Sequence, residues 1–375
     1  MIKELLGTLE AEGNLRRLPT GADFEGRVDL SSNDYLGIAA DGRMMEQFLA
    51  GHIGGYLSAS ASRLLASRQQ AFEDLEETLA ESYGRPALAF NSGYHANVGM
   101  LSALGALPGT VFVADKLVHA SIIDGIRLGG WRLERFRHND LEHAMRVATR
   151  VAADSSTRLV VLVAESVYSM DGDRADLAAL ADIKHKLSTA VETLLYIDEA
   201  HAVGVLGPGG LGLVSAMSRP DEVDIVVGTF GKALASVGAY GVMSDRMRDF
   251  FINRARSLIF STALAPLNVM WSREVFTRAL EMDTERAHLS HLGRILTRKL
   301  ARAGADILAP GSHIQPWIVG SPVRAIEMSQ GLDREGYKVL PIRRPTVPPG
   351  TERLRFSLGA NITVEQLEHL NINGI

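Results

Sequence analysis

The sequence predicts an α/β fold in which helices cover a mostly parallel sheet. Short apolar, β-branched runs alternate with amphipathic stretches through the middle of the 375-residue chain. The runs are almost continuously apolar, as expected for strands buried on both faces. After about Pro266 the pattern changes to a long helix and short strand-like pieces, typical of a smaller α+β domain. We therefore expect an N-terminal segment over residues 1–40, a large domain over 41–266 and a small C-terminal domain over 267–375.

Each expected element follows from its local pattern. Asn139, with Glu142 three residues later, resembles the capping box that begins a helix, and Thr363 with Gln366 predicts the start of the last one. The expected strands of the large domain are Ala87–Phe90, Val111–Ala114, Leu159–Ala164, Leu194–Ile197, Asp224–Gly228 and Tyr240–Met243. The expected helices between them include Phe72–Tyr83, Leu141–Ala152 and Leu177–Leu187. In the small domain we expect a helix with Leu289, Leu292, Ile295, Leu296 and Leu300 on one side, and strands near Ile314–Val319 and Arg353–Ser357.

Composition excludes several classes of protein. The formal net charge of -5 argues against a general nucleic-acid binder. The absence of cysteine excludes disulfides, thiolate metal sites and cysteine nucleophiles. Acidic residues interrupt the first ten positions too early for the apolar core of a signal peptide. No apolar run approaches the roughly 18 residues that a membrane helix needs. The histidines show no metal-binding spacing. We expect a soluble, cytoplasmic protein without a metal site or membrane association.

Lys232 follows the apolar strand 224–228, and ligands of open α/β sheets bind at the carboxyl ends of strands. A partly buried lysine there can become neutral and form a Schiff base, and the hydroxyl of Thr229 could contact a phosphate. The alternative for Lys232 is an exposed loop lysine.

Asp198 follows the apolar strand 194–197 and needs a cationic partner if it is buried. A protonated pyridine nitrogen is such a partner, because pyridoxal phosphate (PLP) enzymes use an aspartate in that role. His201, three residues later, could reach the phenolic oxygen of the cofactor. The alternative for Asp198 is a structural residue that caps the next turn.

Two further segments could contact the same cofactor. His119, after the strand 111–114, could stack on a planar ring, although a lone histidine is more often simply packed. Gly93 and Tyr94 lie between a strand and a helix, where a glycine-containing turn can hold a phosphate. The stretch Gly207–Gly212 matches the dinucleotide pattern G-x-G-x-x-G, but it follows no strand directly and contains Pro208. We interpret it as a glycine-rich loop, and a dehydrogenase as a remote alternative.

Four motifs, listed at the end of this paragraph in chain order, together resemble those of the α-oxoamine synthases. These are PLP enzymes of aminotransferase fold type I. The resemblance extends from about Leu15 to the C-terminus. The segments Ile314–Gly320, Ile342–Pro348 and Glu352–Ser357 are most similar to the branch of the family that uses L-alanine and a pimeloyl thioester. The four motifs are Ser31-Ser-Asn-Asp-Tyr-Leu-Gly37, Ser169-Met-Asp-Gly-Asp173, Asp198-Glu-Ala-His201 and Thr229-Phe-Gly-Lys232.

The resemblance implies a role for each matching residue. Lys232 would bind PLP and move protons at the substrate α-carbon, Asp198 would pair with the pyridine nitrogen, and His201 would pair with the phenolic oxygen. His119 would stack on the ring and contact the substrate. The cofactor would also be held by Ser169, Thr229, Gly93 and Tyr94. Ser261 and Thr262 would reach the phosphate of the neighbouring subunit in a homodimer. The amino-acid carboxylate would bind Arg355, and the substrate would also contact Arg16, Asn33 and Thr346.

The implied reaction is a decarboxylative condensation of L-alanine with pimeloyl-CoA or a pimeloyl carrier-protein thioester, an early step of biotin assembly. The rivals are another α-oxoamine synthase, such as glycine acetyltransferase, and a non-catalytic protein that kept the fold. The family commonly has Gly-Ser-Arg where this chain has Ser60-Ala-Ser-Arg63, and a Gly and a His within the stretch that corresponds to Ala66–Phe72. This region lies near the substrate entrance in the family. The sequence therefore determines the acyl selectivity less well than the use of PLP.

Overall fold

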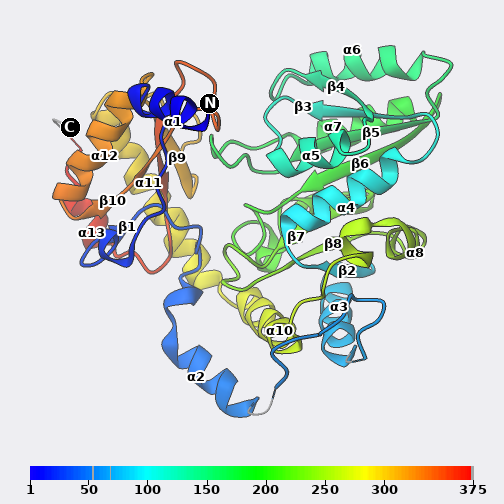
Figure 1. Ribbon diagram of the computed structural model, residues 1–375, viewed down its shortest axis with the longest axis horizontal. Helices are drawn as coiled ribbons and strands as arrows, with labels where there is room; N and C mark the ends of the chain where they lie inside the picture. The colour runs from blue at the N-terminus through cyan, green and yellow to red at the C-terminus, as the bar shows by residue number, and fades with distance from the viewer. Residues whose placement is uncertain (53–54, 68, 373–375) are drawn as a thin grey trace. The chain divides into compact units, whose positions relative to one another are not determined.

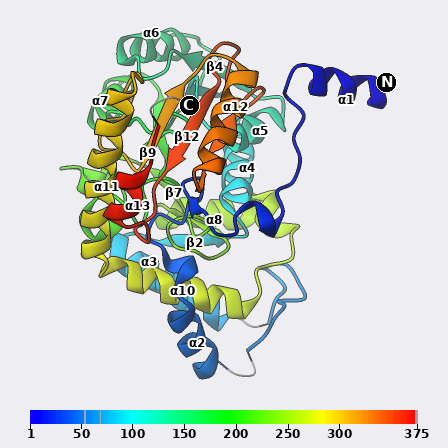
Figure 2. The same cartoon turned by 90° about the vertical axis from the view of Figure 1, so that its left-hand side faces the viewer.

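The structure is a computed structural model that describes residues 1–52, 55–67 and 69–372 (Figures 1 and 2). The chain forms two compact units. Residues 38–168 and 174–283 form the sheet unit, and residues 1–37, 169–173 and 284–375 form the terminal unit. None of the helices in the described ranges is both long enough and apolar enough to cross a membrane.

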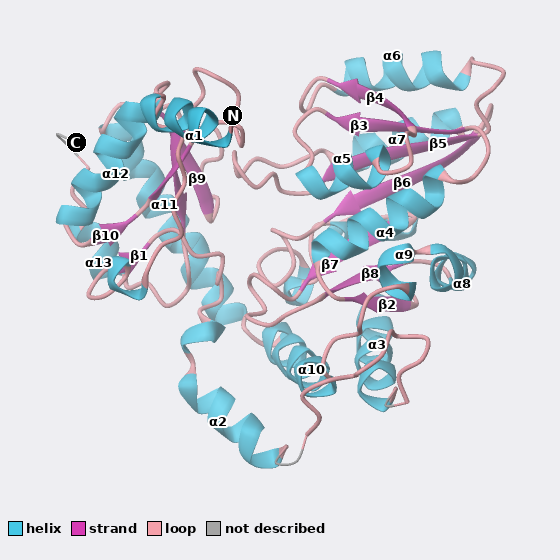
Figure 3. Cartoon of the chain, in the orientation of Figure 1, coloured by secondary structure: helices cyan, strands magenta, loops and turns pink. Residues whose placement is uncertain are grey.

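The sheet unit is built on a seven-stranded sheet with the strand order β2-β8-β7-β6-β5-β3-β4 (Figure 3). β8 pairs antiparallel with β2 and β7, and every other pairing is parallel. The predicted mostly parallel α/β sheet is therefore confirmed. The strands are β2 (Ala87–Phe90), β3 (Thr110–Asp115), β4 (Arg132–Phe136), β5 (Leu159–Glu165), β6 (Glu192–Asp198), β7 (Ile225–Thr229) and β8 (Ala239–Val242).

All six apolar runs predicted as strands form strands of this sheet. β4 was missed because it pairs only with β3 and mixes charged and apolar residues along Arg132–Phe136. Burial on both faces, which makes the other strands recognisable in the sequence, does not apply to β4, in which only Phe136 is buried.

Helices connect the strands and cover the two faces of the sheet. The chain crosses towards β4 through α4 and α5 and returns through α6 and α7, so right-handed crossovers place these two pairs on opposite faces. In agreement, α4 packs against α5 and α6 against α7. The helices of this unit are α2 (Gly42–Gly51), α3 (Gln70–Tyr83), α4 (Gly93–Gly105), α5 (Ala120–Arg127), α6 (Leu141–Ala152), α7 (Leu177–Leu187), α8 (Asp245–Arg254), α9 (Arg256–Ile259) and α10 (Pro266–Leu280). Short 3-10 turns are η2 (Ile38–Ala40), η3 (Pro208–Gly210), η4 (Val214–Ala216) and η5 (Pro220–Glu222).

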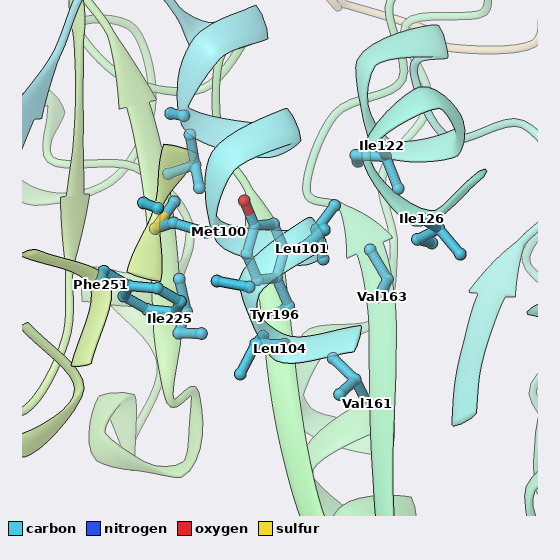
Figure 4. Close-up of a cluster of buried hydrophobic side chains, with 14 of the residues drawn as sticks. Met100, Leu101, Leu104, Ile122, Ile126, Val161, Val163, Tyr196, Ile225 and Phe251 are labelled. Atoms are coloured by element: carbon cyan, nitrogen blue, oxygen red, sulfur yellow. The ribbon is translucent and has the colours of Figure 1, made fainter. Parts of the chain in front are cut away.

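A buried hydrophobic cluster fastens α4 and α5 to the sheet (Figure 4). Full burial of one large aliphatic side chain, such as leucine or isoleucine, contributes about 1.5–3 kcal/mol to the stability of the fold. Because α4 is anchored along its length, its first residues are held at the carboxyl edge of the sheet. The labelled members of the cluster are Met100, Leu101, Leu104, Ile122, Ile126, Val161, Val163, Tyr196, Ile225 and Phe251.

One of the two predicted helix caps is wrong by one residue. The N-cap of α6 is Asp140, whose carboxylate accepts the backbone N–H of His143 at 2.8 Å. Asn139 adopts a left-handed backbone with φ 51°, which asparagine tolerates better than most residues. The capping box at α13 is confirmed, because Thr363 and Gln366 exchange hydrogen bonds of 2.9 and 3.0 Å.

The terminal unit contains a three-stranded antiparallel sheet with the order β11-β12-β9 and a parallel pair of β1 with β10. Figure 2 shows α12 alongside β12, which it contacts. The predicted apolar side of the long helix is buried in α11, and both predicted strands are confirmed as β9 and β12. The elements are α1 (Ile2–Ala11), η1 (Gly21–Asp23), β1 (Val28–Asp29), α11 (Asp283–Arg302), β9 (Ile314–Ile318), α12 (Pro322–Arg334), β10 (Tyr337–Lys338), β11 (Leu340–Ile342), β12 (Arg353–Ser357) and α13 (Val364–His369).

Candidate active site

The carboxyl edge of the seven-stranded sheet gathers most of the predicted cofactor residues. Because β2, β3, β5, β6 and β7 run in one direction, the segments that follow them meet along one edge. They therefore lie at the edge where ligands of open α/β sheets bind. These segments carry Gly93 and Tyr94 after β2, His119 after β3, Asp198 and His201 at and after β6, and Thr229 and Lys232 at and after β7.

Lys232 and His201 are in direct contact, with 2.7 Å between Nζ and Nε2. His201 is buried and Lys232 is half-buried. The alternative of an exposed loop lysine is therefore wrong for Lys232.

Asp198 is held in a buried polar network. Its Oδ2 accepts a hydrogen bond from Asn97 Nδ2 at 2.7 Å, and its Oδ1 accepts the backbone N–H of Ala200 at 2.9 Å. Asn97 Oδ1 in turn accepts a hydrogen bond from the hydroxyl of Tyr196 at 2.7 Å, and Asn97 Nδ2 also donates to Ser121 Oγ at 2.9 Å. A carboxylate so oriented, with 5% of the residue exposed, suits one fixed cationic partner.

Glu165 is a second buried carboxylate at this edge. It ends β5 and is the register partner of Asp198 on β6. Its Oε1 accepts the backbone N–H of His119 in a short hydrogen bond. Burial first, and then the charge of Asp198, raise the pKa of Glu165, while Lys232 lowers it. Glu165 therefore favours the neutral state beside Asp198.

His119 is the N-cap of α5. Its Nδ1 lies 2.7 Å from Ser121 Oγ and accepts the backbone N–H of Ser121 at 3.2 Å, so in the neutral ring the proton is on Nε2. Desolvation lowers the pKa of His119, Asp198 opposes this shift, and Lys232 adds to it. His119 therefore lies within the electrostatic range of both predicted cofactor-binding groups.

The N-terminus of α4 forms a cradle for an anion. Ser92 caps the helix by accepting the backbone N–H of His95 at 3.2 Å, and Gly93 is the first helical residue. A Cβ atom placed on Gly93 would lie 3.9 Å from Thr229 Oγ1, so the missing side chain leaves space beside that hydroxyl. The first N–H groups of a helix attract phosphate. The hydroxyl of Tyr94 donates to Asp124 Oδ2 at 2.7 Å.

Ser261 and Thr262 follow α9, in the same unit as this cradle. The backbone carbonyl of Thr262 accepts a hydrogen bond from Asn91 Nδ2 at 2.6 Å, and Thr262 forms an isolated β-bridge with Ser62. The segment that contains Ser60–Arg63 therefore lies beside Thr262.

Arg63, at the end of the unusual Ser60–Arg63 segment, is firmly anchored. Its guanidinium forms an ion pair with the buried Glu76 at 2.7 Å, donates to Gln69 at 2.8 Å and stacks 4.1 Å over the ring of Phe72. Ser60 adopts φ 55°, a conformation that favours glycine. Arg68, in the predicted Ala66–Phe72 stretch, lies outside the described residues.

The remaining predicted residues form two clusters within the terminal unit. Arg355 is buried and donates to the carbonyl of Ser169 at 2.6 Å, to Asn33 Oδ1 at 3.2 Å and to the hydroxyl of Tyr35 at 3.4 Å. In the second cluster, Arg16 donates to Thr346 Oγ1 at 2.7 Å. Predicted substrate residues far apart in the sequence therefore meet in pairs, while their substrate roles stay predictions.

Sequence reasoning missed Glu165 and Asn97. Glu165 follows the apolar run 159–164, so the rule that identified Asp198 could also have identified it. Asn97 lies in α4, and no local pattern distinguishes its side chain from that of any other polar helix residue. The glycine-rich interpretation of 207–212 is confirmed, because the segment forms the short η3 turn, and Gly212 packs against the carboxylate of Glu199.

These side chains fit PLP in charge and in type. Asp198 offers a carboxylate to a pyridinium nitrogen, Lys232 offers an amine beside His201, and the backbone N–H groups of the α4 cradle offer donors to a phosphate. Among the described residues, no group of three or more His, Asp or Glu that could hold a metal ion occurs.

The chain matches the family "Aminotransferase class I and II" over residues 25–371. The chain therefore belongs to the aminotransferase class I and II family. Relatives include the 8-amino-7-oxononanoate synthase of Haemophilus ducreyi, which is 44% identical over 92% of this chain and 89% of its own. The synthase of the same name from Chlorobaculum parvum is 43% identical over 96% of this chain and 94% of its own.

Solved structures agree with the fold. Serine palmitoyltransferase of Sphingomonas wittichii superposes with a TM-score of 0.86 at 29% identity, over 98% of this chain and 93% of its own. An SPT structure with a PLP internal aldimine superposes with a TM-score of 0.83 at 29% identity, over 91% of this chain and 85% of its own. The 8-amino-7-oxononanoate synthase of Francisella tularensis gives a TM-score of 0.74 at 26% identity, over 92% of this chain and 96% of its own.

Proposed function

We propose that this protein is a PLP-dependent 8-amino-7-oxononanoate synthase that condenses L-alanine with a pimeloyl thioester. The observation that carries the proposal is the Lys232–His201 contact of 2.7 Å at the edge that also holds Asp198. The names of the relatives support the choice of reaction. The cytoplasmic location expected from the sequence stays a prediction.

In this reaction the proton on the α-carbon of alanine is removed and that carbon forms a bond to the thioester carbonyl carbon. The C–S bond breaks and releases the thiol, CO2 leaves from the alanine carboxyl group, and the α-carbon is protonated again. Bound PLP supplies the electron sink for the negative charge at the α-carbon.

The residues of the chain bind, orient and move protons. Lys232 holds the cofactor and then acts as the base and acid at the α-carbon. Asp198, oriented by Asn97 and Ala200, keeps the ring nitrogen protonated. His201 bonds to the phenolic oxygen, and His119 stacks on the ring. The N-terminus of α4 at Gly93 and the hydroxyl of Thr229 bind the phosphate, to which Tyr94 adds its backbone N–H. Ser169 is proposed to hold the cofactor as well.

Arg355 is proposed to bind the alanine carboxylate. Its guanidinium is already directed by the carbonyl of Ser169 and by Asn33, so an incoming carboxylate meets a preoriented fork of donors. The proposed contact of Asn33 with the reacting amino acid follows from its bond to the same guanidinium. Arg16 and Thr346 are proposed to contact the acyl substrate.

A substrate panel tests the reaction. CO2 and thiol release are measured with alanine, glycine and serine, each with pimeloyl, acetyl and palmitoyl thioesters. We expect alanine with the pimeloyl donor to have the highest kcat/KM. A preference for glycine or serine would assign the chain to another branch of the α-oxoamine synthases.

Absorbance tests the cofactor separately. Protein given PLP should show a Schiff-base band near the edge of the visible range, and Lys232→Ala should remove it. Lys116→Ala, which changes an exposed lysine after β3, is the control and should keep the band. Wild-type protein that shows no band would overturn the catalytic reading.

We also propose a homodimer in which Ser261 and Thr262 reach the phosphate of the neighbouring subunit. Exposed apolar side chains on the two segments that meet at the Ser62–Thr262 bridge support it: Leu57, Leu65 and Phe260 are 79%, 78% and 69% exposed. Sedimentation of the purified protein tests the dimer itself.

Mixing two inactive variants tests the shared site. A dimer of one Lys232→Ala subunit and one Ser261→Ala/Thr262→Val subunit contains one complete site only if these hydroxyls act across the interface. Activity that appears after subunit exchange supports the arrangement. Mixed dimers that stay inactive would show that both groups act within one chain.

A further inference from the structure

A buried chain of hydrogen bonds in the sheet unit ends on the ring of His119. The hydroxyl of Tyr196 donates to Asn97 Oδ1 at 2.7 Å. The amide nitrogen of Asn97 donates to Asp198 Oδ2 at 2.7 Å and to Ser121 Oγ at 2.9 Å. Ser121 Oγ in turn lies 2.7 Å from His119 Nδ1. Tyr196, Asn97 and Ser121 are each at most 1% exposed, so water does not compete for these bonds.

The direction of the bonds in this chain follows from the carboxylate of Asp198. A carboxylate only accepts hydrogen bonds, so the amide nitrogen of Asn97, and not its oxygen, faces Asp198. Both hydrogens of that nitrogen are then used, one on Asp198 and one on Ser121 Oγ. Because Ser121 Oγ accepts from Asn97, its own hydrogen is left for His119 Nδ1.

Two donors therefore meet His119 Nδ1. The hydroxyl of Ser121 reaches this atom at 2.7 Å, and the backbone N–H of Ser121 donates to it at 3.2 Å, since His119 is the N-cap of α5. A ring nitrogen that accepts hydrogen bonds carries a lone pair and no hydrogen of its own. The ring is thus neutral with its hydrogen on Nε2, and a proton added at Nδ1 would break both bonds.

We infer that Ser121 is a positioning residue that keeps His119 as a neutral ring with its hydrogen on Nε2. The inference deepens the proposed function and rests on it for the reason that a neutral ring is needed. In that function His119 stacks on the cofactor ring, whose nitrogen is protonated beside Asp198. A neutral imidazole lies on a cationic ring without charge repulsion, whereas an imidazolium is repelled.

The charged groups around His119 act in both directions and do not by themselves secure the neutral ring. Burial lowers the pKa of His119, Asp198 on β6 raises it and Lys232 after β7 lowers it. Asp124 on α5 raises it as well. Glu165 at the end of β5 accepts the backbone N–H of His119 and favours its own neutral form. The two bonds to Nδ1 act in one direction only, because both require its lone pair.

Magnetic resonance of the full-length protein reads the state of the ring directly. Long-range proton–nitrogen spectra of isotope-labelled histidine distinguish a hydrogen on Nδ1 from one on Nε2, and a pH titration of the same signals gives the pKa. His119→Asn identifies the signal of His119. Spectra are recorded before and after PLP is added, so this readout does not depend on turnover.

We expect wild type to show one neutral form, with the hydrogen on Nε2. Ser121→Ala should mix the two neutral forms and raise the pKa of His119, because the hydroxyl bond to Nδ1 is lost. Ser121→Cys keeps the size of the side chain but donates weakly, so it should fall between the two. The matched control is Ser188→Ala, which removes an exposed hydroxyl that donates to the carbonyl of Lys184 at 2.9 Å and should leave the His119 signal unchanged.

The pH profile of turnover is a second readout. If only the neutral ring supports the reaction, kcat/KM falls as the pH drops through the pKa of His119. Ser121→Ala raises this pKa, so the variant should lose about 3- to 10-fold more kcat/KM at the acidic end of the profile than at the alkaline end. A serine that only packs would instead cause an equal loss at every pH.

Three results would overturn the inference. They are an unchanged His119 signal in folded Ser121→Ala, wild-type protein with the hydrogen on Nδ1, and a loss of kcat/KM that does not vary with pH. The first two are read without substrate, so they differ from failure of the proposed function, which the substrate panel detects. Circular dichroism melting curves establish that each variant is folded, and Ser121→Cys decides the question if Ser121→Ala does not fold.

Discussion

Glu165 and Asp198 are paired in register at the carboxyl ends of the neighbouring parallel strands β5 and β6, where 3% and 5% of each residue is exposed. Two adjacent carboxylates with so little water do not both ionise readily. Burial first, and then the charge of Asp198, raise the pKa of Glu165, while Lys232 and the backbone N–H of His119 lower it. Glu165 therefore favours its neutral form more strongly than an exposed glutamate does.

This assignment predicts different effects of two substitutions at Glu165. Glu165→Ala removes the acceptor of the His119 backbone N–H and should lower the free energy of unfolding by about 1–3 kcal/mol. Glu165→Gln keeps a neutral acceptor of the same shape and should stay within about 1 kcal/mol of wild type. Urea denaturation measures both. A Gln variant as unstable as the Ala variant would show that Glu165 is needed in its charged form.

The charge of Asp198 should matter more for turnover than for cofactor binding. Asp198→Asn keeps the size of the side chain but cannot stabilise a protonated ring nitrogen, so kcat should fall by at least about 100-fold while PLP is still bound. Absorbance titration with PLP and steady-state kinetics measure the two effects. Asp182→Asn, at a surface ion pair with Arg219, is the control. Turnover within about threefold of wild type in Asp198→Asn would contradict the role.

The hydrogen bonds around Asp198 should stabilise the folded protein. A variant that removes more of these bonds should lose more free energy of unfolding. Tyr196→Phe removes only the hydroxyl that Asn97 accepts and should cost about 1 kcal/mol. Asn97→Ala leaves the hydroxyl of Tyr196 without an acceptor and Asp198 Oδ2 without its amide donor, and it should cost about 2–4 kcal/mol. Urea denaturation of both variants at one pH compares them. Equal losses would mean that the bond from Tyr196 is the only important one.

Glu199 should make stability depend on pH. Burial raises its pKa from 4.5 to about 7, although the N–H groups of Leu213 and Val214 bond to the carboxylate. The folded state therefore keeps a proton that the unfolded chain has released, and the free energy of unfolding falls as pH rises through the interval from 4.5 to about 7. The total contribution is roughly 3 kcal/mol.

Glu199→Gln should remove this part of the pH dependence. The difference in unfolding free energy between variant and wild type, measured in urea at several pH values, isolates Glu199 from other titrating groups. It should change in favour of the variant between pH 4.5 and about 7 and be constant above that interval. A difference that does not vary with pH would show that Glu199 has an ordinary pKa in the folded protein.

The sequence by itself determined the type of fold and indicated the candidate cofactor residues. Continuous apolar runs reveal strands that are buried on both faces, and Asp198 and Lys232 were recognisable because each follows such a run. Parallel strands end at one edge, so residues after different strands could be expected to meet there without knowledge of strand order. The same reasoning extends to Glu165 but not to the edge strand β4, whose mixed residues carry no such pattern.

Only the tertiary structure decided which side chains touch. Asn97 reaches Asp198 across 101 positions of the chain, and Arg16 reaches Thr346 across 330. Residue patterns report local conformation and burial, which depend on near neighbours in the sequence. Contacts of this kind depend instead on strand order and on the path of the chain between elements, so the bond of Asn97 to Asp198 and that of Arg16 to Thr346 became visible only once the chain was folded.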